Sequence, residues 1–152
     1  MNTSIDTART RLGRLVSQTS RLWRRAADRR LQPYGLTEAT WLPLLQISRS
    51  ETAMNQKDLA ATLSLDNSSV VRLVDTLEAA GLVERQEGQD RRAKTLVLTP
   101  AGEETVSRVE DVAAQLRDEA FAGLDPKDIA TAYRVLDHLC TVFSDPDGEP
   151  QL

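Results

Sequence analysis

The sequence predicts one mainly α-helical domain that carries a small β-element. Two observations indicate this fold class. Apolar residues recur at three- and four-residue spacing over most of the chain, and only residues 82–99 change to the alternation that is typical of strands. The chain has 152 residues, the usual size of a single domain. A folded chain of this length buries roughly 68–70% of its unfolded surface, so the core requires neither disulfides nor metal.

The first half of the chain begins with a long predicted helix. Residues 6–32 repeat apolar side chains at helical spacing, with arginines on the remaining faces, and a Pro-Tyr-Gly segment ends the helix. Thr37 is a suitable N-cap for a second helix over 38–48. Pro43 lies inside that helix and removes one backbone donor, so we expect a local kink there. The polar stretch 49–54 is predicted to be a loop.

Two short helices joined by a tight turn follow this loop. Asn55 and Asp66 are their predicted N-caps, and the helices end near Leu63 and Ala80. Apolar residues at i, i+3, i+4 and i+7 from Val70 form the buried side of the second of these helices. Its opposite face carries small and polar side chains.

The spacing of apolar residues then changes to the alternation of strands, and after residue 99 it returns to helical spacing. Residues 82–87 and 93–99 are two predicted strands, joined by a Gly-Gln-Asp-Arg-Arg tip. Pro100 is suited to the first position of a fifth helix, and Asp125 begins the start signal of a sixth. The acidic tail 145–152 contains Pro and Gly and is predicted to be flexible.

The counts of reactive residues exclude several classes of site. The chain has one Cys and one His, so a disulfide or a Cys/His zinc site cannot form within it. His138 and Cys140 are two residues apart on a predicted helix and therefore point in different directions. Cys140 lies at helical spacing with Leu136 and Phe143, so we expect it in the core, where thiols are unreactive. We predict a protein that is not an enzyme and has no metal or cofactor.

The sequence also predicts a soluble protein. The start of the chain lacks the apolar segment of a signal peptide, and the longest apolar stretch, 41–47, is far shorter than a membrane span. We expect a cytoplasmic protein in a reducing compartment, without a membrane partner.

The net charge of −4 hides a gradient along the chain. Residues 1–32 hold eight Arg and two Asp, a net charge of +6. Residues 33–99 have a net charge of −2, and residues 100–152 hold four basic and twelve acidic groups, a net charge of −8. The overall charge therefore says little about nucleic-acid binding. We expect the basic N-terminal helix to lie against the acidic C-terminal region, within one chain or between two copies.

The order of elements from the third helix to the second strand is typical of a winged helix-turn-helix. An α-helix fits the major groove of DNA, and short side chains at its N-terminus allow a close approach to base edges. The hairpin tip offers Arg91, Arg92 and Lys94, which suit a narrow minor groove. Each feature alone is common on ordinary protein surfaces, as a solvated helix face or an exposed turn. Their ordered combination favours DNA binding.

The sequence resembles the MarR transcription regulators, and most closely the SlyA branch. The strings that carry the resemblance span most of residues 9–138: RLVSQTSRLWRRAADRRLQPYGLT, WLPLL, NQKDLAATL, SSVVRLVDTLEAAGLVERQ and DRRAKTLVLTPAG. The resemblance implies one MarR-type domain over 1–152. Its parts are the dimerisation helices of 1–36 and 100–144, a winged helix-turn-helix core of 37–99, and the flexible tail 145–152.

The resemblance also implies a set of DNA-binding residues. In the family, an Asp of the wing orients an Arg that enters the minor groove, so Asp90 is expected to brace Arg92. Arg85 matches the strand beside the wing and is a candidate for contact with phosphate. The full set comprises Asp66, Asn67, Ser68, Ser69, Arg72, Arg85, Asp90, Arg91, Arg92 and Lys94.

Family members often respond to aromatic carboxylates, and the residues of this sequence that match such a site are Arg21, Arg24, Trp41, Leu45 and Arg72. Arg can hold a carboxylate bidentately and Trp can cover a ring. Trp41 is equally compatible with a role in the core, and Arg21 and Arg24 with neutralising the acidic helices or contacting phosphate. Leu45 replaces a polar ring side chain of the SlyA protein, and Pro43 alters the same helix, which predicts a different or more apolar acid.

Three functions remain open from the sequence. The first is a homodimeric repressor that binds a palindrome with half-sites about 10 bp apart and is released by a small aromatic carboxylate. The second is an activator that, like some SlyA relatives, displaces another DNA-coating protein. The third is a helical module that binds ligands or proteins and has no DNA function.

Overall fold

The computed structural model describes residues 3–88 and 93–144. The chain divides into two compact units, 1–116 and 117–152. The mainly helical architecture with a small antiparallel sheet confirms the predicted fold class. In chain order the elements are α1 (Thr3–Leu31), the 3₁₀ helix η1 (Gln32–Tyr34), α2 (Glu38–Arg49), β1 (Met54–Asn55), α3 (Gln56–Leu63), α4 (Asn67–Ala79), β2 (Val83–Glu87), β3 (Lys94–Leu98), α5 (Pro100–Phe121) and α6 (Pro126–Ser144).

The β-sheet has one more strand than the sequence predicted. Within the described residues its order is β1-β3-β2, and both pairs are antiparallel. Met54 pairs with Leu96 and Asn55 with Thr95, so the prediction of a loop over 49–54 is wrong at its last residue. A strand of two residues is too short to show an alternating pattern, and it was therefore invisible to periodicity.

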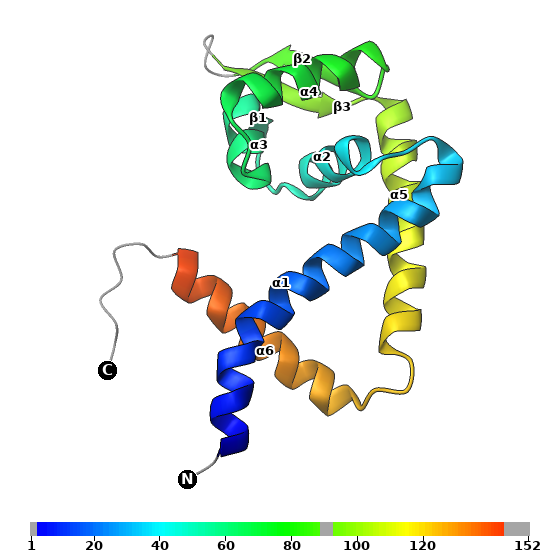
Figure 1. Cartoon of the computed structure of the whole chain (residues 1–152). Helices are drawn as coiled ribbons and strands as arrows, with labels where there is room; N and C mark the ends of the chain where they lie inside the picture. Colours follow the sequence, from blue (N-terminus) through cyan, green and yellow to red (C-terminus); the bar gives the residue numbers. More distant parts are fainter. Residues whose placement is uncertain (1–2, 89–92, 145–152) are drawn as a thin grey trace. The chain divides into compact units, whose positions relative to one another are not determined.

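The hydrophobic core of the first unit connects residues 37–99, called the winged segment below, with α5 and with the end of α1. From α4 it takes Val70, Val74 and Leu77, as the apolar spacing predicted, while Leu73 is only partly buried. Figure 1 shows α3 and α4 beside the sheet, and α2 near α3. The remaining buried apolar residues are Ala27, Leu31, Trp41, Leu44, Leu45, Ile47, Leu59, Ala60, Val83, Leu96, Val106, Val109, Val112 and Leu116.

The predicted helix cap at Asn55 forms its side-chain hydrogen bonds, whereas the one at Thr37 does not. Asn55 and Asp58 form a capping box: the Asp58 N–H donates to Asn55 Oδ1 over 2.9 Å, and the Asn55 N–H donates to Asp58 Oδ2 over 3.0 Å. Thr37 is the N-cap of α2, but its side chain makes no capping hydrogen bond. Helix α2 continues through the buried Pro43.

The start of α5 is held closely against the α4–β2 connection. Thr99 Oγ1 donates to the Gly81 carbonyl and accepts from the Gly102 N–H. A Cβ at the buried Gly102 would overlap the carbonyl oxygen of Leu82, so this approach requires glycine. The glycine of the TPAG string therefore fixes the place where α5 leaves the winged segment.

Helix α6 differs from the core helices because none of residues 126–144, all of which the structure describes, is buried. Phe143 is 80% exposed and Leu136 is 42% exposed. The prediction that Cys140 is a core residue is wrong for the single chain, where this thiol is exposed. The spacing correctly indicated an apolar helix face, but spacing does not say which chain covers it.

No helix within 3–88 and 93–144 combines the length and apolar character needed to cross a membrane. The tail 145–152, predicted to be flexible, lies outside the described residues.

Candidate nucleic-acid interface

The N-terminus of α4 is organised by the carboxylate of Asp66. Asp66 Oδ1 accepts from the Ser69 N–H over 2.7 Å and from Ser68 Oγ over 2.8 Å, and Oδ2 accepts from Ser69 Oγ over 3.0 Å. The Ser69 backbone bond, followed by the two hydroxyl bonds, lowers the pKa of Asp66. Three predicted DNA-binding residues therefore form one local network, in which Asp66 acts as the helix cap.

The turn between α3 and α4 keeps the two helices close. Ser64 adopts a left-handed conformation with φ of 54°, and the Leu65 N–H donates to the Ala60 carbonyl over 2.9 Å. This arrangement ends α3 and directs the chain into the cap of α4. The helix-turn-helix is thus specified by local backbone chemistry as well as by the buried face.

A groove of about 490 Å³ lies beside the start of α4. It brings together three of the predicted DNA-binding residues, Asn67, Arg85 and Lys94. Lys57 and Gln56, which the sequence analysis did not single out, line it from the first turn of α3. The signal that could have found them is the N-cap at Asn55, because it places both side chains at the exposed start of a helix.

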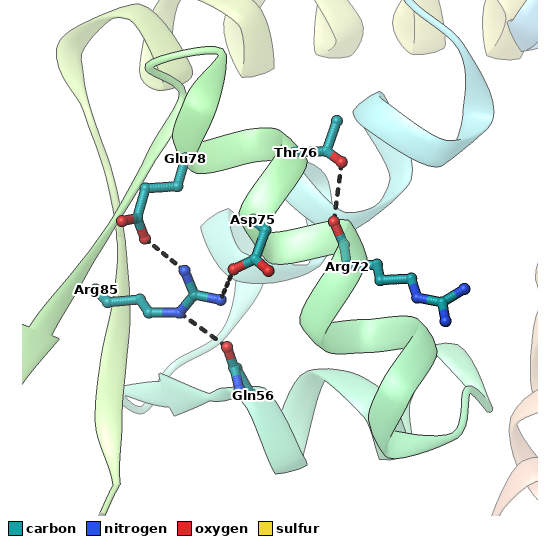
Figure 2. A network of polar contacts seen from close by, with 6 residues as sticks. All are labelled: Gln56, Arg72, Asp75, Thr76, Glu78 and Arg85. Carbon is teal, nitrogen blue, oxygen red and sulfur yellow. Dashed lines mark hydrogen bonds and ion pairs between the residues drawn. The ribbon is translucent and has the colours of Figure 1, made fainter.

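Arg85 donates three side-chain hydrogen bonds to residues of two helices (Figure 2). Its Nη1 donates to Glu78 Oε2 over 2.7 Å, its Nη2 to Asp75 Oδ1 over 2.6 Å, and its Nε to Gln56 Oε1 over 2.9 Å. Desolvation alone would lower the pKa of Arg85, but the bonds to the two carboxylates outweigh it and raise the pKa. Contact between Arg85 and phosphate stays a prediction, because the guanidinium is already engaged within the protein.

Arg72 is placed differently on the same helix. Figure 2 shows its side chain pointing away from the Arg85 cluster, and the residue is exposed. Its backbone carbonyl accepts from Thr76 Oγ1 over 2.9 Å. Its guanidinium therefore extends from α4 without joining the cluster around Arg85.

The wing is described only at its base. Lys94 begins β3, is exposed, and pairs with Glu87 across the two strands. Asp90, Arg91 and Arg92 lie outside the described residues, so the expected bracing of Arg92 by Asp90 stays a prediction.

The five residues expected to bind an aromatic carboxylate fall into two groups. Trp41 and Leu45 are 5% and 6% exposed and belong to the core, and Trp41 Nε1 donates to Asp28 Oδ1 over 3.4 Å. Arg21 and Arg24 are exposed on α1, and Arg24 lies 3.6 Å from Glu38. Arg72, the fifth, is exposed on α4. The described residues contain no group of three or more His, Cys, Asp or Glu side chains arranged to hold a metal ion.

Comparison with known proteins identifies the family to which this architecture belongs. The model of the MarR family matches residues 34–93. The crystal structure of the transcriptional regulator PA3341 is 37% identical in sequence, with 88% of this chain and 98% of that chain covered and a TM-score of 0.80. The chain belongs to the MarR family. Placement of this MarR-family transcriptional regulator in the SlyA branch stays a prediction.

Two further solved structures resemble this MarR-family chain. Apo wild-type MarR from E. coli is 27% identical, with 84% of this chain and 96% of that chain covered and a TM-score of 0.72. CouR from Rhodococcus jostii RHA1, solved bound to p-coumaroyl-CoA, is 28% identical, with 84% and 90% covered and a TM-score of 0.71. These likenesses agree with the family and with the helix-turn-helix and wing elements described above.

Proposed function

We propose that this MarR-family regulator is a cytoplasmic homodimeric repressor that binds a palindromic operator and is released by a small aromatic carboxylate. The observation that carries the DNA-binding part is the capped, polar N-terminus of α4 beside the groove that ends at the wing strands. A helix of this kind enters the major groove, and the wing follows the adjacent backbone or minor groove. Asn67, Ser68, Ser69 and Arg72 are the proposed contacts from α4.

The unburied apolar residues support the homodimer. Helix α6 buries none of its apolar residues and exposes most of them, and α1 exposes Ile5, Leu15 and Leu22. An exposed apolar face of this extent requires a partner surface. A second copy of the chain offers the same faces under twofold symmetry, which also gives an operator of two half-sites.

The aromatic carboxylate is supported by the exposed guanidinium groups and by one relative. Arg21, Arg24 and Arg72 are exposed and can hold a carboxylate bidentately. CouR was solved with p-coumaroyl-CoA, which carries an aromatic acyl group. Because Trp41 and Leu45 are buried in this chain, the ligand would reach them only through a rearrangement of α2.

A fluorescence anisotropy titration tests this function. The DNA upstream of the coding sequence is titrated with protein at several salt concentrations, with and without a panel of aromatic carboxylates. We expect nanomolar affinity that falls steeply with salt, because binding releases counterions from phosphates. At least one carboxylate should weaken binding. Affinity that is weak and equal for a scrambled duplex would contradict the DNA-binding part, and insensitivity to every carboxylate would contradict the effector part.

Substitution of Arg92 tests the wing. Arg92→Ala should lower operator affinity about tenfold or more, since the proposed minor-groove contact is lost. The dimer should remain, as sedimentation at the same concentration can show. Gln89→Ala is a matched control at the same tip, without a change of charge. Unchanged affinity of the Arg92 variant would remove the wing from the interface.

A further inference from the structure

The cluster around Arg85 joins three elements of the winged segment at one point. Arg85 lies on β2, Asp75 and Glu78 lie three residues apart on α4, and Gln56 begins α3. Residues three apart on a helix share one face, so both carboxylates are directed to the same guanidinium. All three guanidinium nitrogens donate hydrogen bonds, and the Arg85 side chain is only 19% exposed. One side chain therefore fixes α4, the proposed recognition helix, to β2, the first strand of the wing.

The charges of this cluster do not favour binding of a DNA phosphate by Arg85. Its one positive charge is shared by two carboxylates, so the three charged groups sum to a net charge of −1. A phosphate approaching Arg85 would meet two carboxylates and a guanidinium that already donates three of its five N–H groups within the protein. Charge-assisted hydrogen bonds of this length are strong and directional, and they hold the side chain in one geometry.

Because of its position, the cluster can affect where both proposed DNA contacts lie, at the N-terminus of α4 and at the wing. On β2, Val83 is buried and Arg85 shares its face, so the polar cluster continues the contact with α4 beyond the apolar core. Asn67 lies eight residues before Asp75, about 12 Å along the helix axis. A tilt of α4 by about 5° at Asp75 would therefore move its N-terminus by about 1 Å. Glu87, at the end of β2 beside the wing tip, is about 7 Å from Arg85 along the strand.

We propose that Arg85 is a positioning residue that fixes the angle between the recognition helix and the wing, and so determines sequence discrimination without contacting DNA. The proposal rests on the proposed DNA-binding function. Hydrogen bonds to base edges lose strength with shifts of a few tenths of an ångström, whereas contacts to phosphates tolerate them. Loss of the cluster should therefore weaken specific binding and spare non-specific binding.

Two variants distinguish this role from contact with phosphate. Arg85→Gln removes the charge but keeps a donor, and the double variant Asp75→Asn with Glu78→Gln keeps Arg85 and removes its two ion pairs. Each is compared with the wild type on a duplex that the wild type selects from a randomised pool, and on a scrambled duplex of equal length. Glu84→Gln, on the opposite and exposed face of β2, is the matched control.

We expect both variants to lose about tenfold or more of the ratio between specific and scrambled affinity, similar to the loss of one base contact. The dependence of affinity on salt should be unchanged, and Arg85→Lys should restore only part of the ratio because it cannot bridge both carboxylates in one plane. A direct phosphate contact would give another result. Arg85→Gln would then weaken both duplexes equally and lower the salt slope by about 0.9 per lost contact, while the double variant would bind both duplexes more tightly.

Equal weakening of both duplexes by Arg85→Gln, or tighter binding of both duplexes by the double variant, would overturn the positioning role. An unchanged ratio of specific to scrambled affinity in both variants would also overturn it. The double variant changes exposed carboxylates to isosteric amides, so it keeps the test valid if Arg85→Gln fails to fold. Failure of the proposed function is recognised separately, because the wild type itself would then select no duplex over the scrambled one.

Discussion

The winged segment and helix α6 both carry apolar residues at helical spacing, yet they use them in opposite ways. In α4, Val70, Val74 and Leu77 are buried by the rest of the same chain. In α6, residues at equivalent helical spacing, such as Leu136 and Phe143, remain exposed. The winged segment buries its apolar face within one chain, whereas α6 leaves its apolar residues unburied, as the proposed homodimer requires.

The two regions therefore differ in whether their apolar residues stabilise the single chain. A buried apolar side chain stabilises the fold at any protein concentration. An exposed apolar face contributes only when a partner binds, so its contribution depends on concentration. In helix α5, the buried residues from Val106 to Leu116 belong to the core of the first unit and therefore stabilise the single chain.

Truncation of a core leucine should have the largest effect. Leu59 is fully buried on α3, and Leu59→Ala should lower the free energy of unfolding by about 2–5 kcal/mol because it removes apolar contact and leaves a cavity. Urea unfolding at fixed protein concentration measures this. The same truncation at Leu65, which is 40% exposed, is the control and should cost less than about 1 kcal/mol. Equal losses at the two positions would contradict the assignment of the core.

A charge on the apolar face of α6 should act on assembly. Leu136→Asp should raise the dissociation constant of the dimer about tenfold or more, because a carboxylate would be desolvated between the two copies. Sedimentation over a range of concentrations measures this. Thr141→Asp, on the polar face of the same helix, should leave the dimer unchanged. If both variants dimerise like the wild type, α6 is not part of the dimer interface.

Loss of a helix cap should have a smaller effect. Asn55→Ala removes the acceptor that the first turn of α3 uses, and should cost about 1 kcal/mol of unfolding free energy. Urea unfolding detects such a change. Asn67→Ala, one residue inside α4, leaves the Asp66 cap of that helix in place and should change stability by less than about 0.5 kcal/mol. A cost at Asn67 that matches the cost at Asn55 would contradict the capping box as the cause.

The smallest expected effect is on how the free energy of unfolding depends on pH in the acid range. The pKa of Asp66 in the folded chain is lowered below its ordinary value of 3.8, so the carboxylate stabilises the fold fully above that value and loses this contribution as pH falls through the lowered pKa. The stability difference between wild type and Asp66→Asn should be constant at neutral pH and narrow below about pH 4. Urea midpoints measured against pH test this. A difference that stays constant through this acid range would show that Asp66 is not the titrating group.

The sequence predicted most helices and both longer strands because the signals are local. The capping box at Asn55, the cap at Asp66 and the apolar spacing of α4 all act within a few residues. It missed β1, which is too short to show a period, and it placed Cys140 in a core that the single chain does not supply.

The candidate site was less predictable than the fold because its geometry comes from distant parts of the chain. Lys94 and Asn67 were found from their places on the wing and the recognition helix. The role of Arg85 was not, because Gln56 lies 29 residues away in sequence and only the fold brings it to the guanidinium. Asp75 and Glu78 resemble an ordinary solvated helix face until β2 is placed beside them.

The number of chains and of contact sites on one duplex tests directly whether two copies of this chain bind DNA together. A complex with the duplex that the wild type selects is weighed by sedimentation, and the protected bases are mapped by chemical footprinting. We expect two chains per duplex and two protected segments about 10 bp apart, related by twofold symmetry, because paired α6 faces present two winged segments to the DNA. One chain on a single protected segment would contradict the proposed homodimer on a twofold-symmetric operator.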